Sequence, residues 1–510
     1  MANVLRRVSL FGLNWRVLSV TALVGVLAIP YIPWAACNRL EDYLITLRYA
    51  RNAAAGIGAV FSEGQLYQGF TSPLQFCIGY LLCLASLGEE TIPSIICLTG
   101  LLGIVLLGVN LAYWVVGRLS FSALIVAVCL VLSSENFLEH VGFDSVWAIG
   151  FASTSLSLLT RSRYLSAGIT LALAILVRHD AALLSLLVSM SLLVERNWRG
   201  LLRVVTPLIA LTLPWYAFAT WYWGSPLPIT LGEKINQGHS GYPIFNQTFG
   251  QVMQKPFQWF PLNSGMLLAG AIVFMVVGVA WWIIRRTREE YPIKWSHSSI
   301  LRLTSNPFFL FSTWAVLQFV AYFAVLRVPP IYGWYHAYIV AALLVLLGIA
   351  PIWLAAQGEC RFIRLTRERK VRWKDLSPIL LAVTVVYWAG FASFEHFNRH
   401  IPRDNPGRYR YEGYHAAAKW INANAEASDI IRIGEIGVFG WYCPLNIEDL
   451  GCITMRRVPD EKTRFRYLVK SADPESSDSR LLRSLLQCEL VASFANPNDY
   501  NILVFKKKAG

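Results

Sequence analysis

Long apolar segments recur along this chain from Leu18 to about Ser393, and short polar loops separate them. A helix needs about 20 mainly apolar residues to cross the hydrocarbon core of a bilayer, and many of these segments have that length. The pattern therefore predicts a polytopic helical membrane domain over residues 1–393.

The pattern changes after Phe394, where polar residues dominate and the apolar runs become short. Two of these runs are typical of strands and two longer stretches are typical of helices. They are residues 430–433 and 502–505 for the strands, and 413–425 and 480–489 for the helices. We expect a soluble α/β domain over residues 394–510.

Basic residues in the loops predict the orientation of the membrane domain. Four loops are rich in arginine and lysine: Arg161/Arg163, Arg196/Arg199/Arg203, Arg285/Arg286/Arg288, and Arg361 to Lys374. Cytoplasmic loops carry such an excess, so these four are predicted to be cytoplasmic. The basic N-terminal segment lacks a small-residue cleavage site and reads as the flank of a first membrane helix with a cytoplasmic N-terminus. The alternating loops and the C-terminal domain are then extracytoplasmic.

The helix count depends on one short apolar run. Three runs follow the first exterior loop, which spans residues 37–71: they are 72–88, 92–117 and 119–134. An even number of crossings must separate that loop from the exterior Asp144, and Arg118 is better placed on the inside. Residues 72–88 are therefore predicted to lie at the membrane surface, which gives about 11 spanning helices.

Composition agrees with a membrane protein. Hydrophobic residues make up 55% of the chain and its mean hydropathy is +0.46. The net charge of +14 comes from clusters beside apolar segments, which indicates cytoplasmic flanks and not a nucleic-acid surface. None of the nine cysteines forms a metal-ligand spacing; Cys443, Cys452 and Cys488 lie in the polar part, where an oxidising compartment would permit a disulfide.

The stretch from Glu41 to Asn52 carries the clearest candidate chemistry. Two adjacent carboxylates, Glu41 and Asp42, open an amphipathic segment that also contains Arg48. A carboxylate at the membrane surface could activate a sugar hydroxyl as general base, while an arginine or lysine binds phosphate. The alternative is structural: Asn38 and Glu41 have the spacing of a helix capping box, which explains Glu41 but explains Asp42 less well.

Further charged and aromatic residues fall at the exterior ends of predicted helices. Asp144, Arg178 and Asp180 lie at the membrane edge, where ionisable groups are costly and usually functional. Their alternative role is a structural Arg–Asp pair, or an Arg178 that reaches toward the membrane surface. The segment Trp334-Tyr335-His336 could stack on a sugar and move a proton, or its rings could belong to an interfacial aromatic belt.

Several segments together resemble one family. They are Glu41 to Asn52, Gly56 to Phe61, Gln68 to Leu74, Gly142-Phe143-Asp144, Arg178-His179-Asp180, Gly224 to Pro228 with Lys234, Gly434 to Gly437, and Ile447 to Leu450. In these segments the chain is similar to bacterial GT-C glycosyltransferases related to the terminal arabinofuranosyltransferases of actinobacterial cell walls. It departs from their pattern at Glu41, Gln68, Asp144 and His179, where the family usually has aspartate, an acid, glutamate and proline.

The resemblance implies a membrane enzyme of GT-C fold. Such an enzyme moves a monosaccharide, here arabinofuranose, from a polyprenyl-phosphate donor to an envelope glycan, glycolipid or glycoprotein on the exterior side. Glu41 or Asp42 would be catalytic, as a base or through a divalent cation (Mg, Mn or Ca) on the leaving phosphate. The remaining candidates for binding the donor phosphate or substrate are Arg48, Asp144, Arg178, Asp180, Lys234, Trp334, Tyr335 and His336.

Two other classes of function stay open from the residues. A secondary transporter or lipid flippase would favour inverted repeats and charges near the bilayer midplane, whereas this chain shows no evident repeat and its charges gather at one face. A non-catalytic envelope scaffold built on an enzyme fold is the third class, and the departures at Glu41 and Gln68 favour it.

Overall fold

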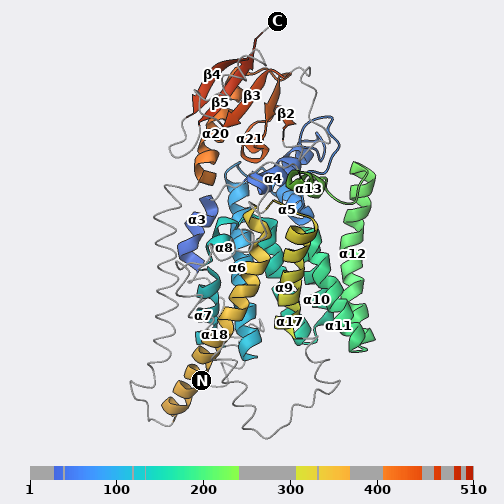
Figure 1. Ribbon diagram of the computed structural model, residues 1–510, viewed down its shortest axis with the longest axis vertical. Helices are drawn as coiled ribbons and strands as arrows, with labels where there is room; N and C mark the ends of the chain where they lie inside the picture. Colours follow the sequence, from blue (N-terminus) through green and yellow to red (C-terminus); the bar gives the residue numbers. More distant parts are fainter. Residues whose placement is uncertain are drawn as a thin grey trace, which may run out of the picture.

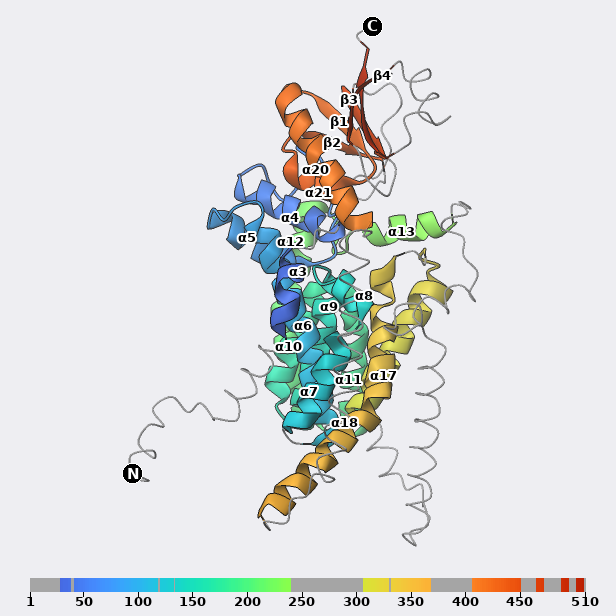
Figure 2. The same ribbon diagram turned by 90° about the vertical axis from the view of Figure 1, so that its left-hand side faces the viewer.

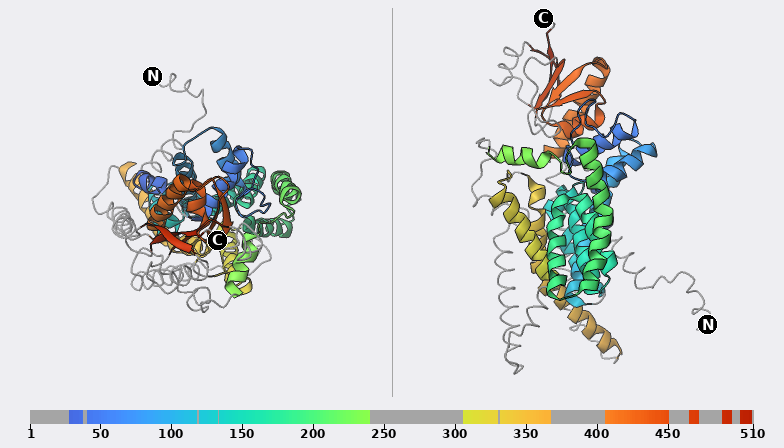
Figure 3. Two further views of the ribbon diagram at one scale, coloured as in Figure 1. Left: turned by 90° about the horizontal axis from the view of Figure 1, so that it is seen from above. Right: turned by 90° about the vertical axis from the view of Figure 1, so that its right-hand side faces the viewer.

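The computed structural model describes ten stretches of the chain: residues 28–37, 41–117, 120–132, 134–239, 306–329, 332–367, 406–450, 465–471, 488–494 and 501–508. Within them a long helical bundle carries a β-sheet at one end (Figure 1). We call residues 406–508 the sheet unit, and the end of the bundle beneath it the sheet end. Seen from above, the sheet unit lies over the bundle (Figure 3).

Three of the described helices are long and apolar enough to cross a membrane. They are α6 (Thr91–Val116), α12 (Trp198–Trp223), and α17 (Pro307–Val320) with its π-helical continuation η4 (Ala321–Val325). At 1.5 Å per residue, the 26 residues of α6 extend about 39 Å. The expected total of about 11 spans includes apolar runs outside the described residues, such as the one beginning at Leu18, so that count stays a prediction.

The other bundle helices are shorter or lie at its ends. They are η2 (Ile29–Tyr31), α3 (Ile32–Cys37), α7 (Phe121–Leu132), α8 (Glu135–Glu139), α9 (Asp144–Thr160), α10 (Tyr164–Val177), η3 (His179–Ala181), α11 (Ala182–Val194), η5 (Gly333–Tyr335) and α18 (Ala337–Arg367). Helix α9 packs between α6 and α10, and α10 also packs against α12. This arrangement brings the first residue of α9 to the sheet end.

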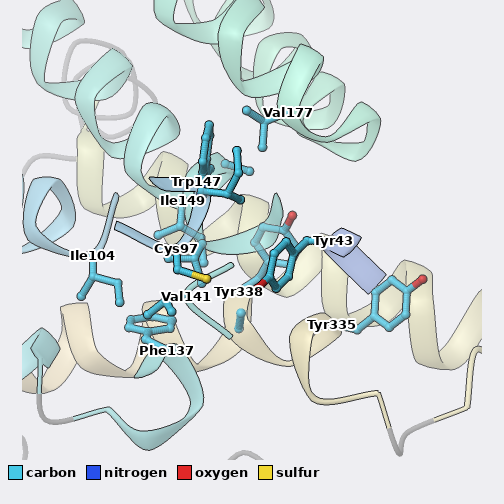
Figure 4. Close-up of a cluster of buried hydrophobic side chains, with 14 of the residues drawn as sticks. Tyr43, Cys97, Ile104, Phe137, Val141, Trp147, Ile149, Val177, Tyr335 and Tyr338 are labelled. Atoms are coloured by element: carbon cyan, nitrogen blue, oxygen red, sulfur yellow. The ribbon is translucent and has the colours of Figure 1, made fainter. Parts of the chain in front are cut away.

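Close backbone contact holds α6 against α9. A Cβ atom on Gly150 would lie 2.7 Å from the Cα atom of Gly103, so neither helix can approach the other this closely with a larger residue there. Asn110 adds hydrogen bonds across the same interface, to Ser153 and Thr154, both at 3.1 Å. Figure 4 shows the buried cluster that these helices share with α4 and α18.

Three short helices lie between the bundle and the sheet unit: α4 (Glu41–Ala54), α5 (Pro73–Leu84) and α13 (Thr230–His239) (Figures 1 and 2). Helix α5 has 12 residues and extends about 18 Å, which is less than the hydrocarbon thickness of a bilayer. Ser72 begins it by accepting a hydrogen bond from the backbone N–H of Gln75. The run 72–88, expected not to cross, is thus a short helix packed against α4.

The sheet unit contains five strands: β1 (Ile430–Ile433), β2 (Asn446–Asp449), β3 (Tyr467–Ser471), β4 (Cys488–Phe494) and β5 (Ile502–Lys507). Their order is β2-β1-β3-β5-β4; β1 is parallel to β2 and β3, and β5 is antiparallel to β3 and β4. Helix α20 (Pro406–Asn424) packs against β4 and β5, and α21 (Ile436–Tyr442) packs against α4.

The strands expected at 430–433 and 502–505 and the helix expected at 413–425 are present. The helix expected at 480–489 is wrong at its end, because Cys488 and Glu489 belong to β4 and pair with Lys507 and Lys506 of β5. Sheet pairing there overrides the local helical pattern; residues 472–487 lie outside the described part. Cys443 and Cys488 are buried, while Cys452 is not described.

Candidate active site

A cavity of about 40 Å³ lies at the sheet end, where α4, α13 and η5 meet the first turns of α5 and α9. Six of the residues expected from the sequence line it: Asp42, Asp144, Arg178, Lys234, Trp334 and Tyr335. These residues come from five separate parts of the chain. A space of this size holds a few water molecules, so a sugar phosphate requires the surrounding side chains to move apart.

Several helices begin at the cavity. Asp42 lies in the first turn of α4, Gln75 in that of α5, Asp144 is the first residue of α9, and Thr230 is the first residue of α13. The backbone N–H groups of a first turn lack intrahelical acceptors and carry partial positive charge. Their convergence stabilises the carboxylates of Asp42 and Asp144, and it also favours a phosphate group.

Asp42 is half-buried and faces the cavity. Its burial raises the pKa of the carboxyl group above the ordinary value of 3.8, the positive charge of Lys234 opposes that rise, and the negative charges of Asp144 and Glu435 add to it. A carboxylate with a raised pKa is a better proton acceptor for a hydroxyl group. Glu41 is the first residue of α4, and its side chain lies outside the described part of the structure.

Arg178 lies buried between two carboxylates. Its Nη1 donates to Oδ1 of Asp144 at 2.6 Å, its Nε to Oδ2 of Asp180 at 2.7 Å, and its Nη2 to the hydroxyl of Tyr322 at 3.1 Å. The hydroxyl of Tyr322 donates to Asp180 in turn, and Tyr338 donates to the other oxygen of Asp180 at 3.2 Å. All three nitrogen atoms of this guanidinium group therefore donate hydrogen bonds within the protein. The main effect of Arg178 is to fix Asp144 at the cavity wall.

The second oxygen of Asp144 accepts a hydrogen bond from Thr71. Thr71 also lines the cavity and stands two residues before α5. Both oxygens of Asp144 are thus bound by protein groups. Asp180 does not line the cavity; it supports Arg178 from behind.

Lys234 is buried and enters the cavity from α13. Its Nζ lies 3.5 Å from the ring centroid of Tyr332 and 5.6 Å from that of Trp334, which are cation–π distances. Tyr332 is held in turn by a hydrogen bond from its hydroxyl to Oε1 of Gln237 at 2.6 Å. The aromatic faces help to hold the ammonium group at the cavity.

Aromatic rings form one wall of the cavity. Trp334 stacks on Phe143 with centroids 4.7 Å apart and an angle of 24° between the rings. Asn136 fixes the segment that carries Trp334, because its Nδ2 donates to the carbonyl of Gly333 at 3.0 Å. Such a wall offers a flat apolar face to a sugar ring.

Besides Asp180, two more of the expected residues lie away from the cavity. Arg48 is 1% exposed, and backbone carbonyls of the first loop and the sheet unit occupy its guanidinium group: Phe61, Gly440, Cys443 and Leu445. His336 is fully buried, and its ring stacks on Phe323 at 4.5 Å. The structure brings neither side chain to the cavity.

The residues that the sequence did not single out are mainly hydroxyl and aromatic groups. Thr71, Phe143 and Thr230 line the cavity, and Tyr322 and Tyr338 support Arg178. Thr71 and Phe143 stand inside segments that carried the family resemblance, so their position was a usable signal. Tyr322 and Tyr338 stand in apolar runs, where a tyrosine is indistinguishable from one in an aromatic belt.

The described residues contain no group of three or more His, Cys, Asp or Glu side chains placed to bind a metal ion. The described residues that line the cavity include two carboxylates, Asp42 and Asp144, and protein groups donate to both oxygens of Asp144. A magnesium ion held by one or two carboxylates completes its coordination with water and substrate phosphates.

Comparison with known proteins gives a family match and several structural matches. Residues 70–313, slightly less than half of the chain, match the model of glycosyltransferase family 87. No curated protein matches the chain in sequence. Two crystal structures of ArnT from Cupriavidus metallidurans resemble it at 15% identity: the apo form, with a TM-score of 0.58, and a form bound to undecaprenyl phosphate, with a TM-score of 0.54.

The structural resemblance extends over almost the whole length of both proteins. The apo structure covers 97% of this chain and 99% of its own, and the lipid-bound structure covers 96% and 98%. The bundle and the sheet unit therefore have the arrangement of the ArnT fold.

Proposed function

We propose that this chain is a membrane glycosyltransferase of GT-C type, which moves a monosaccharide from a polyprenyl phosphate to an acceptor of the cell envelope. Arabinofuranose is the sugar that the sequence resemblance favours, and the acceptor class is a glycan, glycolipid or glycoprotein. The observation that supports this proposal best is the placement of Asp42 and Lys234 on one cavity that first-turn residues of several helices line.

In the proposed reaction, Asp42 accepts the proton of the acceptor hydroxyl. The hydroxyl oxygen forms a bond with the anomeric carbon of the donor sugar, and the bond between that carbon and the phosphate oxygen breaks. The leaving polyprenyl phosphate takes both electrons of the broken bond. Lys234 and the first-turn N–H groups stabilise its charge, so no strong general acid is required.

The other cavity residues position the reactants. Arg178 and Thr71 hold Asp144 at the wall, where its carboxylate can accept hydrogen bonds from sugar hydroxyls through its remaining lone pairs. Phe143 and Trp334 offer a stacking face for the sugar ring. We assign Glu41 no separate role, and no step passes through a metal ion.

A polyprenyl phosphate as donor carrier is supported by the comparison. One of the two similar ArnT structures is bound to undecaprenyl phosphate. The cavity of this chain lies at the sheet end, close to the ends of apolar helices, so a lipid tail in the membrane could deliver its phosphate there.

We place the sheet end on the exterior side, with a cytoplasmic N-terminus, from the distribution of basic loop residues. A reporter protein fused after Phe394 tests this orientation in cells. Activity of a periplasmic alkaline phosphatase fusion is expected. Fluorescence of a cytoplasmic reporter at the same site would reverse the orientation and separate the cavity from envelope acceptors.

The reaction is tested by sugar transfer in detergent with the full chain. Wild-type protein is offered arabinofuranose, mannose and glucose, each linked to decaprenyl or undecaprenyl phosphate, together with envelope extracts as acceptor. We expect transfer of one sugar, and a loss of about 10²–10⁴-fold in kcat for Asp42→Asn, which keeps the shape but removes the base. Glu63→Gln is the matched control, because Glu63 is an exposed carboxylate of the first loop.

Lys234→Met tests the phosphate contact separately. This variant keeps the length of the side chain but loses its charge, so KM for the donor should rise by at least tenfold. Full activity of Asp42→Asn would remove the proposed base. The absence of transfer from every polyprenyl-phosphate sugar would refute the donor class.

A further inference from the structure

Helix α4 separates the cavity from the sheet unit. Asp42, Ile45 and Thr46 lie on one face of this helix and line the cavity. At 100° per residue, Arg51 projects from the opposite face and Arg48 from the flank of the helix. They meet α21 of the sheet unit, so the helix that carries the candidate base is held from the side away from the substrate.

Arg48 makes the most extensive of these contacts. Its Nη1 donates to the carbonyls of Gly440, at 2.5 Å, and of Cys443, and its Nη2 donates to that of Leu445 at 2.7 Å. Its Nε donates to the carbonyl of Phe61 at 2.6 Å, and the guanidinium group lies 4.5 Å from the ring centroid of the same residue. One side chain therefore ties α4, the first loop and the end of α21 together.

Two of the carbonyls that Arg48 binds, those of Gly440 and Cys443, lie at the C-terminal end of α21, where the last turn lacks intrahelical donors and carries partial negative charge. A guanidinium group suits this site because its planar fork directs several N–H groups at once. Gly440 allows the approach: a Cβ atom there would lie 2.7 Å from the ring of Phe61 and 3.2 Å from Cδ of Arg48.

Other hydrogen bonds hold the same interface in register. The hydroxyl of Ser62 donates to the carbonyl of Ile447 at 3.0 Å and accepts from its N–H at 2.9 Å. The indole of Trp441 donates to the carbonyl of Glu89 at 3.0 Å. These contacts join residues more than 350 positions apart, and together with Arg48 we call them the seam.

We propose that Arg48 is a positioning residue for sugar transfer: by locking α4 onto α21, it sets the place of Asp42 relative to the donor phosphate at Lys234. The sheet unit thereby helps to position the candidate base of the catalytic centre. This inference rests on the proposed function for its effect on the reaction, while the lock itself can be measured without any substrate.

The test compares two buried arginines of the sheet-unit region. Arg48→Lys keeps the charge but replaces the fork by one ammonium group, which cannot reach all four carbonyls. Arg432→Lys is the matched control, because Arg432 forms a buried pair with Glu448 inside the sheet, with Nε and Nη2 at 2.9 and 2.8 Å from Oε2. Both variants are made in the full chain and purified in detergent.

Hydrogen exchange followed by mass spectrometry measures the lock. Peptides from α4 and α21 should exchange at least tenfold faster in Arg48→Lys than in wild type. In Arg432→Lys the increase should be confined to the strands. Unchanged exchange of α4 in Arg48→Lys would overturn the lock.

Kinetics and binding then separate positioning from phosphate binding. For the sugar donor that the wild type uses, Arg48→Lys should lower kcat at least tenfold and leave KM within twofold. Binding of undecaprenyl phosphate should be unchanged in Arg48→Lys and weakened in Lys234→Met. An Arg48→Lys variant that binds undecaprenyl phosphate as weakly as Lys234→Met, or that keeps full kcat despite faster exchange, would overturn the positioning role.

A failure of the proposed function gives a different result. In that case the wild type transfers no sugar, and exchange of α4 still decides whether Arg48 locks it to the sheet unit.

Discussion

Two buried arginines lie at the sheet end, on opposite sides of α4, and their surroundings differ in kind. Arg178 pairs with the carboxylates of Asp144 and Asp180 beside the cavity. Arg48 lies in the seam and pairs with backbone carbonyls. The cavity network is thus made of ionised partners, whereas the seam is made of partners that cannot titrate.

This difference indicates that the network around Arg178 serves the reaction, whereas the contacts of Arg48 hold the structure together. Buried ion pairs are costly to desolvate and seldom add net stability, so a network of one arginine with two carboxylates is better explained by the need for charge at the cavity. Carbonyl partners present fixed dipoles at the end of a helix, and they carry no ionisable group of their own. Four predictions test this contrast, in order of decreasing effect.

The largest effect is expected from Arg178→Met. Removing the guanidinium group leaves Asp144 and Asp180 buried without their cation, which should cost about 3–5 kcal/mol in the free energy of unfolding. Thermal unfolding in detergent measures the loss. The triple variant Arg178→Met/Asp144→Asn/Asp180→Asn should recover part of it, because no uncompensated charge remains. If Arg178→Met were as stable as wild type, leaving Asp144 and Asp180 buried without their cation would have no cost in the free energy of unfolding.

Tyr322→Phe should have the second largest effect. The phenol hydroxyl donates to Asp180 and accepts from Arg178, and hydrogen bonds to charged groups contribute about 1.5–3 kcal/mol. Unfolding midpoints of Tyr322→Phe and of Tyr80→Phe, a tyrosine half-buried in α5, give the comparison. Equal midpoints for the two variants would show that the hydroxyl adds nothing to the cavity network.

The pH dependence should distinguish the cavity from the seam. Burial raises the pKa of Asp42 above 3.8, so between that value and the raised pKa the folded protein binds more protons than the unfolded chain. The contribution of this group to stability is therefore full below 3.8 and is lost as pH rises through the raised pKa. Activity should change in the opposite sense, because the base form is needed.

Below the raised pKa, kcat/KM should fall by up to tenfold per pH unit, which corresponds to about 1.4 kcal/mol. A pH profile of sugar transfer measures this acid limb, which is the fall of kcat/KM below the raised pKa. Asp42→Asn should abolish the limb. In Arg48→Lys the limb should remain, at a lower rate, because the seam contains no group that titrates in this range. A limb that persists in Asp42→Asn would assign it to another residue.

Much of the cavity could be predicted from the sequence, because charged residues at the ends of apolar runs are rare and their side of the membrane follows from the loop charges. Asp42, Asp144 and Arg178 were found in this way, Lys234 came from the family resemblance, and the four residues meet at one cavity. Strands such as 430–433 were predictable for a similar reason, since short apolar runs in a polar segment have few alternatives.

The role of Arg48 could not be predicted by the same reasoning. Its partners are carbonyl groups, which every residue has, and three of the four stand 392 to 397 positions away. No pattern of side chains marks such a contact. From sequence alone, a charged residue in a motif is interpreted as a ligand for a substrate. The same charge can instead bind backbone carbonyls and join two parts of the fold.

The smallest effect is expected from a seam contact that involves no ion, Ser62→Ala. The Ser62 hydroxyl both donates to and accepts from Ile447, and each neutral hydrogen bond contributes about 0.5–1.5 kcal/mol. The unfolding midpoint should fall slightly, and kcat should fall less than in Arg48→Lys, because the arginine still ties α4 to α21. Thr170→Ala, whose hydroxyl bonds only within α10, is the control. Ser62→Ala could instead lower kcat as much as Arg48→Lys does. The whole interface between α4 and the sheet unit would then set the position of Asp42, and Arg48 would have no greater part in it than the neutral contacts.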